Sequence, residues 1–168
     1  AGIHALSRQY GFKIIEDASH AIGGKYKGEL IGNGRYSEIT VFSFHPVKII
    51  TSGEGGMAVT NDANLAKHLR LLRSHGISSA AADMQPRPAQ EIWNYQQINL
   101  GFNYRMPNLN ACLGLNQMDQ MEKFLISKRK VANIYSDFFK QTPFRFWSEP
   151  DNCESNYWLN TVSFSSSQ

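Results

Sequence analysis

Long apolar runs and blocks of like charge are both absent from this sequence of 168 residues. No apolar stretch approaches the roughly 20 residues that a helix needs to span a bilayer, and nothing at the start resembles a signal peptide. The 17 Lys and Arg against 14 Asp and Glu leave a net charge of +3, without a basic run typical of nucleic-acid or membrane binding. We therefore expect a cytoplasmic protein that binds neither nucleic acid nor membrane.

Cysteine is also scarce. Cys112 and Cys153 are the only two, and they lie far apart in the chain. They lack the clustered Cys or His spacing of a zinc site, and such isolated cysteines are typical of free thiols in a reducing compartment. The sequence therefore predicts neither a disulfide nor a metal site.

Short apolar runs separated by turn residues predict several strands in the first third of the chain. The run at residues 12–16 is expected to be a buried strand, and further strands are expected at residues 37–43 and 56–60. Five glycines among polar residues at 23–34 indicate turns or a short hairpin. Adjacent strand residues face opposite sides of a sheet, so Glu16 should point away from Asp17.

Two helices are expected in the rest of the chain. Asn61 or Asp62 can cap a helix that ends at Gly76. A long helix should have Pro107 in its first turn and extend as far as Phe139. Strands that alternate with helices in this way indicate an α/β sandwich.

Two segments have weaker patterns. Residues 77–100 contain two prolines, no clear period and the aromatic pair Trp93 and Tyr95, so we expect a mobile loop over a binding surface. Residues 156–164 are strand-like, and no partner strand follows them. Such a strand would expose unpaired backbone groups, which suggests an incomplete chain.

Lys48 is the first candidate for chemistry. It ends an apolar run that includes Val41, Phe42 and Phe44, and a glycine-rich run follows it at residues 52–56. A lysine leaving a buried strand into such a loop suits Schiff-base chemistry, which needs an amine kept partly unprotonated and a cofactor held rigidly. The alternative is a surface lysine that extends from a loop. The glycines have neither the spacing of a dinucleotide fingerprint nor that of a P-loop.

Asp17 is the second candidate. With Glu16 it ends the first predicted strand, which is where open α/β sheets place ligand-binding residues. The alternative is a solvated charge at the end of a strand. If both candidates are functional, Asp17 and Lys48 would face one ligand from two strand ends.

Five segments, in their order and spacing, resemble the sugar aminotransferases of the DegT/DnrJ/EryC1/StrS family. They are residues 16–23, 42–48, 53–56, 73–76 and 101–106. The runs Ser-Phe-His-Pro-Val-Lys and Arg-Ser-His-Gly-Ile resemble the PseC-type subgroup in particular. Members of that subgroup aminate C4 of a UDP-linked 4-keto-6-deoxy-N-acetylhexosamine on the way to pseudaminic acid.

This resemblance implies a fold, a cofactor and partners. The implied fold is the three-layer α/β domain of the fold type I, aspartate-aminotransferase-like transferases that depend on pyridoxal 5'-phosphate (PLP). L-Glutamate and a nucleotide sugar would be the substrates, and a homodimer would share its active sites between subunits. A PLP-binding or truncated member that only regulates or pairs remains an alternative, as does a related aminotransferase for another nucleotide sugar. Family dehydratases have histidine in place of the active lysine, so Lys48 argues against that activity.

The resemblance also assigns roles within the cofactor site. Lys48 would be the catalytic residue that binds the cofactor covalently and then carries the proton. Asp17 would pair with the pyridinium nitrogen, and Ser43 would bond the phosphate, although a strand hydroxyl bonded to backbone is the alternative for Ser43. His20 would reach the ring face or its 3-hydroxyl, with a buried structural histidine as the alternative.

Three further residues are implied near the substrates. His45 would shape the turn or touch substrate. Asn103 resembles the residue that contacts the cofactor phosphate of the neighbouring subunit, and Arg105 would bind the substrate diphosphate or the donor carboxylate. A loop amide and a surface arginine are the alternatives for these two.

Relatives of this family are more than twice as long as this chain. The resemblance therefore implies that residues 1–106 are the C-terminal part of a large PLP-binding domain and that residues 107–142 are a long connecting helix. Residues 143–168 would be the first segment of a truncated small α+β domain. On this interpretation the fragment alone is inactive.

Overall fold

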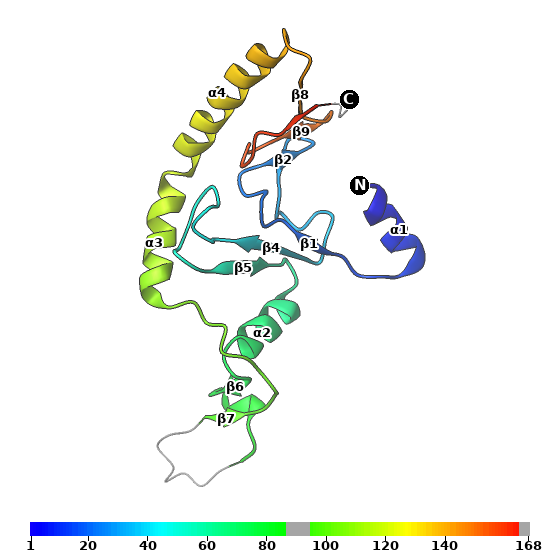
Figure 1. Cartoon of the computed structure of the whole chain (residues 1–168). Helices are drawn as coiled ribbons and strands as arrows, with labels where there is room; N and C mark the ends of the chain where they lie inside the picture. Colours follow the sequence, from blue (N-terminus) through cyan, green and yellow to red (C-terminus); the bar gives the residue numbers. More distant parts are fainter. Residues whose placement is uncertain (87–94, 165–168) are drawn as a thin grey trace.

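A three-stranded sheet lies at the centre of the computed structural model, which describes residues 1–86 and 95–164 (Figure 1). Its strands are β1 (Ile15–Asp17), β4 (Ile39–Ser43) and β5 (Gly56–Val59), in the order β1-β4-β5. β1 runs parallel to β4, and β4 runs antiparallel to β5. The parallel pairing aligns the carboxyl ends of β1 and β4, so the residues that follow these strands emerge at one edge.

Short helices and strands surround this sheet. The bounds of the remaining elements are α1 (Gly2–Tyr10), β2 (Lys25–Tyr26), β3 (Glu29–Leu30), α2 (Ala63–Leu72), β6 (Ile77–Ser78), a 3₁₀ turn at Ala81–Asp83, β7 (Gln96–Gln97), α3 (Asn108–Asp119), α4 (Met121–Phe139), β8 (Arg145–Phe146), β9 (Cys153–Glu154) and β10 (Val162–Ser163). Among the described residues, no helix is both long and apolar enough to cross a membrane.

The buried core lies directly behind the segment that carries Lys48. Phe44, Ile49, Ile50 and Leu125 form its buried cluster, so two of its four members follow Lys48 in sequence. Partly buried apolar side chains pack against this cluster; they are Ile22, Phe42, Met106, Met121, Phe124 and Trp158. Burying these side chains fixes the Lys48 segment against α4, because each large apolar side chain gains about 1.5 to 3 kcal/mol on burial.

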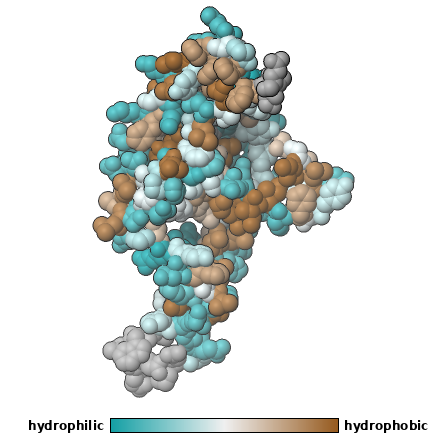
Figure 2. Space-filling view, viewed as in Figure 1, coloured by the Kyte–Doolittle hydropathy of each residue, from teal (hydrophilic) through white to brown (hydrophobic). Residues whose placement is uncertain are grey.

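The first strand differs from its prediction. It begins at Ile15 instead of residue 12, and Ile15 is 68% exposed while Phe12 is 43% exposed. The reason is that β1 is an edge strand whose neighbours cover little of it. Figure 2 shows an apolar patch (brown) where the segment between α1 and β1 crosses this face of the molecule.

The predicted turns and first helix cap are confirmed. The glycine-rich stretch at residues 23–34 contains the hairpin of β2 and β3, paired antiparallel. Asp62 caps α2, since its carboxylate accepts hydrogen bonds from the backbone N–H groups of Asn64 and Leu65 at 2.8 and 3.1 Å. After α2 ends at Leu72, Gly76 adopts a φ of 69° and its N–H donates back into the last turn.

The long helix is divided into two. A break at Gln120 separates α3 from α4, and Figure 1 shows the chain changing direction there. The new direction places Met121, Phe124 and Leu125 on the core cluster, which a single straight helix through residue 139 need not do. Pro107 is the N-cap of α3 in an extended conformation and does not lie in the first turn.

Two other predictions about loops and strands are wrong. Residues 77–100, predicted to be a loop, contain β6 and β7, which pair antiparallel; Trp93 lies outside the described residues. The last strand, β10, is not left unpaired, because β8 pairs with it antiparallel beneath α4. Both errors have the same cause: two-residue strands carry too little alternation to be recognised in the sequence.

Candidate active site

A tightly bonded turn carries Lys48 out of β4. The Lys48 N–H donates to His45 O at 3.0 Å, and the Ser52 N–H donates to Phe44 O at 3.0 Å, so residues 44–52 form a closed loop. The Thr51 hydroxyl also donates to Phe44 O at 3.0 Å. Lys48 itself is partly buried, at the rim of the core. Its backbone is therefore fixed, while its amine can reach the edge of the sheet.

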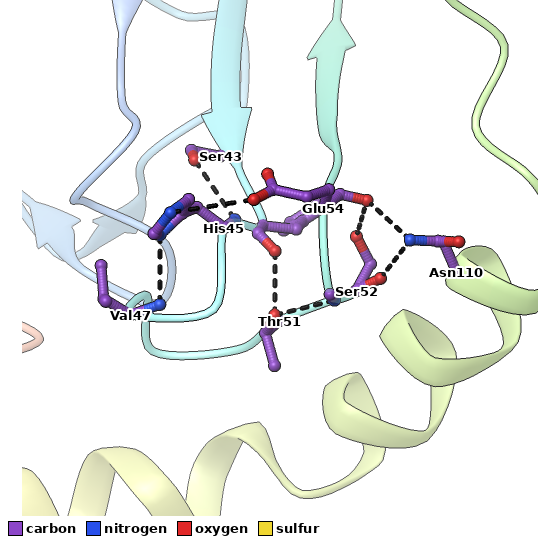
Figure 3. A network of polar contacts seen from close by, with 9 residues as sticks. Ser43, His45, Val47, Thr51, Ser52, Glu54 and Asn110 are labelled. Atoms are coloured by element: carbon purple, nitrogen blue, oxygen red, sulfur yellow. Dashed lines mark hydrogen bonds and ion pairs between the residues drawn. The ribbon is translucent and has the colours of Figure 1, made fainter.

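The glycine-rich run that follows is tied to α3 (Figure 3). The Asn110 amide donates to Ser52 O at 2.7 Å and to Glu54 O at 3.1 Å, and the Ser52 hydroxyl donates to Glu54 O at 2.9 Å. Asn110 thus donates to two carbonyls of this turn, one of which, Glu54 O, also accepts from the Ser52 hydroxyl. We did not identify Asn110 from the sequence, since nothing in a helical asparagine marks it as a loop anchor.

His45 and Ser43 lie at the entry to the same loop (Figure 3). His45 Nδ1 accepts from the Val47 N–H at 3.3 Å, and His45 Nε2 lies 3.8 Å from a Glu54 carboxylate oxygen. The Ser43 hydroxyl accepts weakly from the His45 N–H at 3.4 Å. These bonds make His45 a residue that shapes the turn, and they leave the Ser43 hydroxyl proton free to donate elsewhere.

Asp17 is exposed at the end of β1 and is held in its ionised form. Its Oδ1 accepts hydrogen bonds from the Ser19 hydroxyl at 2.5 Å and from the Ser19 N–H at 3.0 Å. These two bonds, with smaller contributions from the positive charges of His20 and Lys48, lower the pKa of Asp17 below its ordinary value. Asp17 is therefore an anion at neutral pH.

Glu16 points the other way, as predicted. Its carboxylate accepts hydrogen bonds from Thr40 Oγ1 at 3.1 Å and Ser37 Oγ at 3.4 Å. Thr40 is only 1% exposed, so Glu16 faces the side of the sheet on which Thr40 is buried. Of this carboxylate pair, only Asp17 is on the side of Lys48.

The indole of Trp158 contacts both His20 and Lys48. The rings of Trp158 and His20 stack with centroids 3.8 Å apart and planes 17° from parallel, and Lys48 Nζ lies 4.4 Å from the indole centroid. Trp158 Nε1 donates to Val47 O at 2.6 Å. This contact could not be predicted from the sequence, because Trp158 lies 110 positions after Lys48 and no periodic pattern relates them.

Asn103 and Arg105 are not part of this cluster. Both are exposed, and their segment lies beside the residues that end α2. The Tyr104 N–H donates to Arg73 O at 2.9 Å, and Asn103 forms an isolated bridge with Ser74. Within residues 1–86 and 95–164, no hydrogen bond or ion pair connects Asn103 or Arg105 with Lys48. The structure therefore gathers Asp17, His20, Ser43 and His45 around the Lys48 loop and leaves the other two apart.

The gathered residues fit the chemical needs of PLP. The cofactor requires an amine for its aldehyde, an anion for its ring nitrogen and donors for its phosphate. Lys48, Asp17 and Ser43 could supply these groups, because they lie at the carboxyl ends of β1 and β4 and in the loop beyond them. Two surface hollows lie elsewhere, one beside His4 and one beside Tyr26, and we define the candidate site by its side chains.

Comparison with known proteins gives a consistent result. The family description "DegT/DnrJ/EryC1/StrS aminotransferase family" matches residues 1–168. The chain is 36% identical over 142 residues to a UDP-4-amino-4,6-dideoxy-N-acetyl-beta-L-altrosamine transaminase of Campylobacter jejuni. The aligned region covers 84% of this chain and 35% of the relative. The chain thus spans about a third of the length of this curated relative.

Solved structures share the fold. Helicobacter pylori PseC, an aminotransferase involved in pseudaminic acid biosynthesis, superposes with a TM-score of 0.85 at 27% identity, over 98% of this chain and 41% of that one. The PMP form of Spr1654, a putative sugar aminotransferase of Streptococcus pneumoniae, gives 0.82 at 26% identity, over 96% and 41%. The predicted fold class, that of fold type I PLP-dependent transferases, is confirmed. The sequence and structure together show that this chain belongs to the DegT/DnrJ/EryC1/StrS aminotransferase family.

Proposed function

We propose that the protein is a PLP-dependent aminotransferase that moves an amino group from L-glutamate to the C4 ketone of a UDP-linked 4-keto-6-deoxy-N-acetylhexosamine. The observation that carries this proposal is the placement of the Lys48 amine on a fixed loop, on the same side of the sheet as the ionised Asp17. The names of the Campylobacter and Helicobacter proteins support the choice of sugar. PLP supplies the electron sink that such a transfer needs.

Each side chain then has a defined task. Lys48 would present the amine that holds the cofactor covalently and would carry a proton to and from the α-carbon of the amino donor. Asp17, kept ionised by Ser19, would stabilise a protonated ring nitrogen and so strengthen electron withdrawal. The Ser43 hydroxyl would donate to the phosphate. His20 would contact the face of the cofactor ring or its 3-hydroxyl.

The protein's assembly and organisation complete the proposal. We place the active site in a cytoplasmic homodimer, in which Asn103 reaches the cofactor phosphate of the neighbouring subunit and Arg105 binds a substrate anion. The position of both residues away from Lys48 supports this arrangement, because among the described residues no hydrogen bond or ion pair joins them to the Lys48 of their own chain. The three parts of the chain are then residues 1–106 of the large domain, the connection at 107–142 and residues 143–168 of the small domain.

Residues 153–158, which we assign to the small domain, contact the site. β9 pairs antiparallel with β2, and the Asn156 amide donates to His20 O. These residues therefore help to form the surface around Lys48.

Amine transfer from labelled glutamate tests this function. The full-length protein, with PLP, ¹⁵N-glutamate and the UDP-4-keto sugar, should yield a UDP-4-amino sugar that carries ¹⁵N, as measured by mass spectrometry. Lys48→Arg should abolish the product, whereas Lys27→Arg, a change at an exposed lysine near Tyr26, should not. Labelled product with another nucleotide sugar alone would correct the substrate; no labelled product with any keto sugar would refute the aminotransferase.

A further inference from the structure

Trp158 contacts three parts of the proposed site at once. Its indole stacks on His20 at 3.8 Å, lies 4.4 Å below the Lys48 amine and donates through Nε1 to Val47 O at 2.6 Å. The hydrogen bond is to the residue directly before Lys48. One side chain therefore contacts both the amine of Lys48 and the loop that carries it.

The backbone of Trp158 is fixed as firmly as its ring. Its N–H donates to Asn156 Oδ1 at 3.0 Å, and the Asn156 amide donates to His20 O at 2.7 Å and Ile22 O at 2.9 Å. Asn156 is only 5% exposed, so these bonds are protected from water. Between them Tyr157 has a φ of 48°, a conformation that non-glycine residues seldom adopt. This turn, which is unfavourable for a tyrosine, places the indole beside the Lys48 amine.

We propose that Trp158 is a positioning residue for Lys48 and His20, an inference that rests on the proposed function. A lysine side chain has many rotamers, and an aromatic face that attracts its ammonium group reduces them. The indole therefore keeps the amine beside the loop, where the cofactor aldehyde must meet it. Trp158 itself does not react with cofactor or substrate.

The stack also restricts how His20 can meet a cofactor. A separation of 3.8 Å between the two ring centroids leaves no room for a third ring between them. Only the opposite face or the edge of His20 is open to the cofactor, and Trp158 supports the imidazole from behind. A purely structural Trp158 would contribute packing to the core cluster and nothing else.

A first measurement tests the contact in the protein without cofactor. Lysines carrying ¹³C-methyl groups give separate NMR signals, and the one lost in Lys48→Arg belongs to Lys48. Because the amine lies over an indole face, this signal should be shifted upfield by the ring current. Trp158→Leu should return it to the position of exposed lysines, while Trp147→Leu, a change at a tryptophan that is 64% exposed, should leave it unchanged.

A second measurement tests the role. Covalent attachment of PLP, followed by borohydride trapping over time, should be about fivefold slower in Trp158→Leu than in the wild type, because the freed lysine regains rotamer entropy and its amine meets the cofactor aldehyde less often. Trp158→Phe keeps an aromatic face and should stay within about twofold of the wild-type rate. Thermal midpoints of the three proteins show whether a slower rate merely reflects unfolding, and the wild-type NMR signal tests the contact without any substitution.

The outcomes separate the two proposals. A ring that only favoured the charged amine would hinder attachment, so its removal would make attachment faster. Equal or faster attachment in a folded Trp158→Leu protein would overturn the positioning role, and so would a Lys48 signal without an upfield shift in the wild type. If the wild-type protein attached no PLP at Lys48, the proposed function would fail, and the positioning role would fail with it.

Discussion

Replacing Asn156 by alanine should destabilise the protein more than any other single change to an uncharged polar side chain near the site. The Asn156 amide donates to His20 O and Ile22 O, and Oδ1 accepts from the Trp158 N–H, at distances from 2.7 to 3.0 Å. Alanine leaves all three backbone groups without this partner. At about 1 kcal/mol for each hydrogen bond, the loss in free energy of unfolding is about 3 kcal/mol.

Urea denaturation followed by circular dichroism measures this loss. An unchanged m value with a midpoint lowered by about 1 to 3 M would correspond to about 3 kcal/mol. Asn64→Ala is the matched control, because Asn64 is exposed on α2 and should change stability by less than about 0.5 kcal/mol. Asn156→Asp should be no better than alanine, since its second oxygen would face two carbonyls. A loss below about 1 kcal/mol for Asn156→Ala would show that the three hydrogen bonds of Asn156 do not stabilise the fold as proposed.

Two further predictions concern the site edge and the turn after α2. Ser19→Ala removes one of the two donors that lower the pKa of Asp17, so a ¹³C-carboxyl NMR titration should show that pKa rising toward its ordinary value. A carboxyl group whose pKa is lowered in the folded protein stabilises the fold at pH values above its unfolded pKa, about 3.9, and this stabilisation is lost as the pH falls through the folded pKa. Ser19→Ala should therefore lower the free energy of unfolding at pH 6 but not at pH 2. An equal loss at both pH values would contradict this assignment. Gly76→Ala would place a Cβ 1.9 Å from Asn99 O at a φ of 69°, whereas Gly28→Ala, at a φ of 79°, meets nothing within 4 Å. In thermal melts, Gly28→Ala should therefore lower the free energy of unfolding by only about 1 kcal/mol, for backbone strain, and Gly76→Ala should lower it by at least twice as much. Equal losses would show that the contact with Asn99 relaxes freely.

The sequence predicted those parts of the site that lie close together along the chain. Lys48 and its glycine-rich run are adjacent to an apolar strand, and Asp17 ends another, so apolar patterning and turn residues were sufficient to select them. The Asp62 cap and the hairpin between residues 23 and 34 were predictable for the same reason, since each depends on a few neighbouring residues.

Contacts between distant segments could not be predicted in this way. Trp158 and Asn156 follow β9, which pairs with β2, and two-residue strands leave no periodic pattern in a sequence. The break at Gln120 depends on how α4 packs on the core, which helix propensity does not encode. The exposure of Ile15 likewise depends on the position of β1 at the sheet edge.

The lysine that binds the cofactor can be identified directly. The full-length protein should be incubated with PLP, reduced with borohydride and digested, and the modified peptide should be identified by mass spectrometry. We expect a single pyridoxyl group on Lys48, absent in Lys48→Arg and retained in Lys27→Arg. A pyridoxyl group on another lysine, or none in a folded protein, would contradict this expectation.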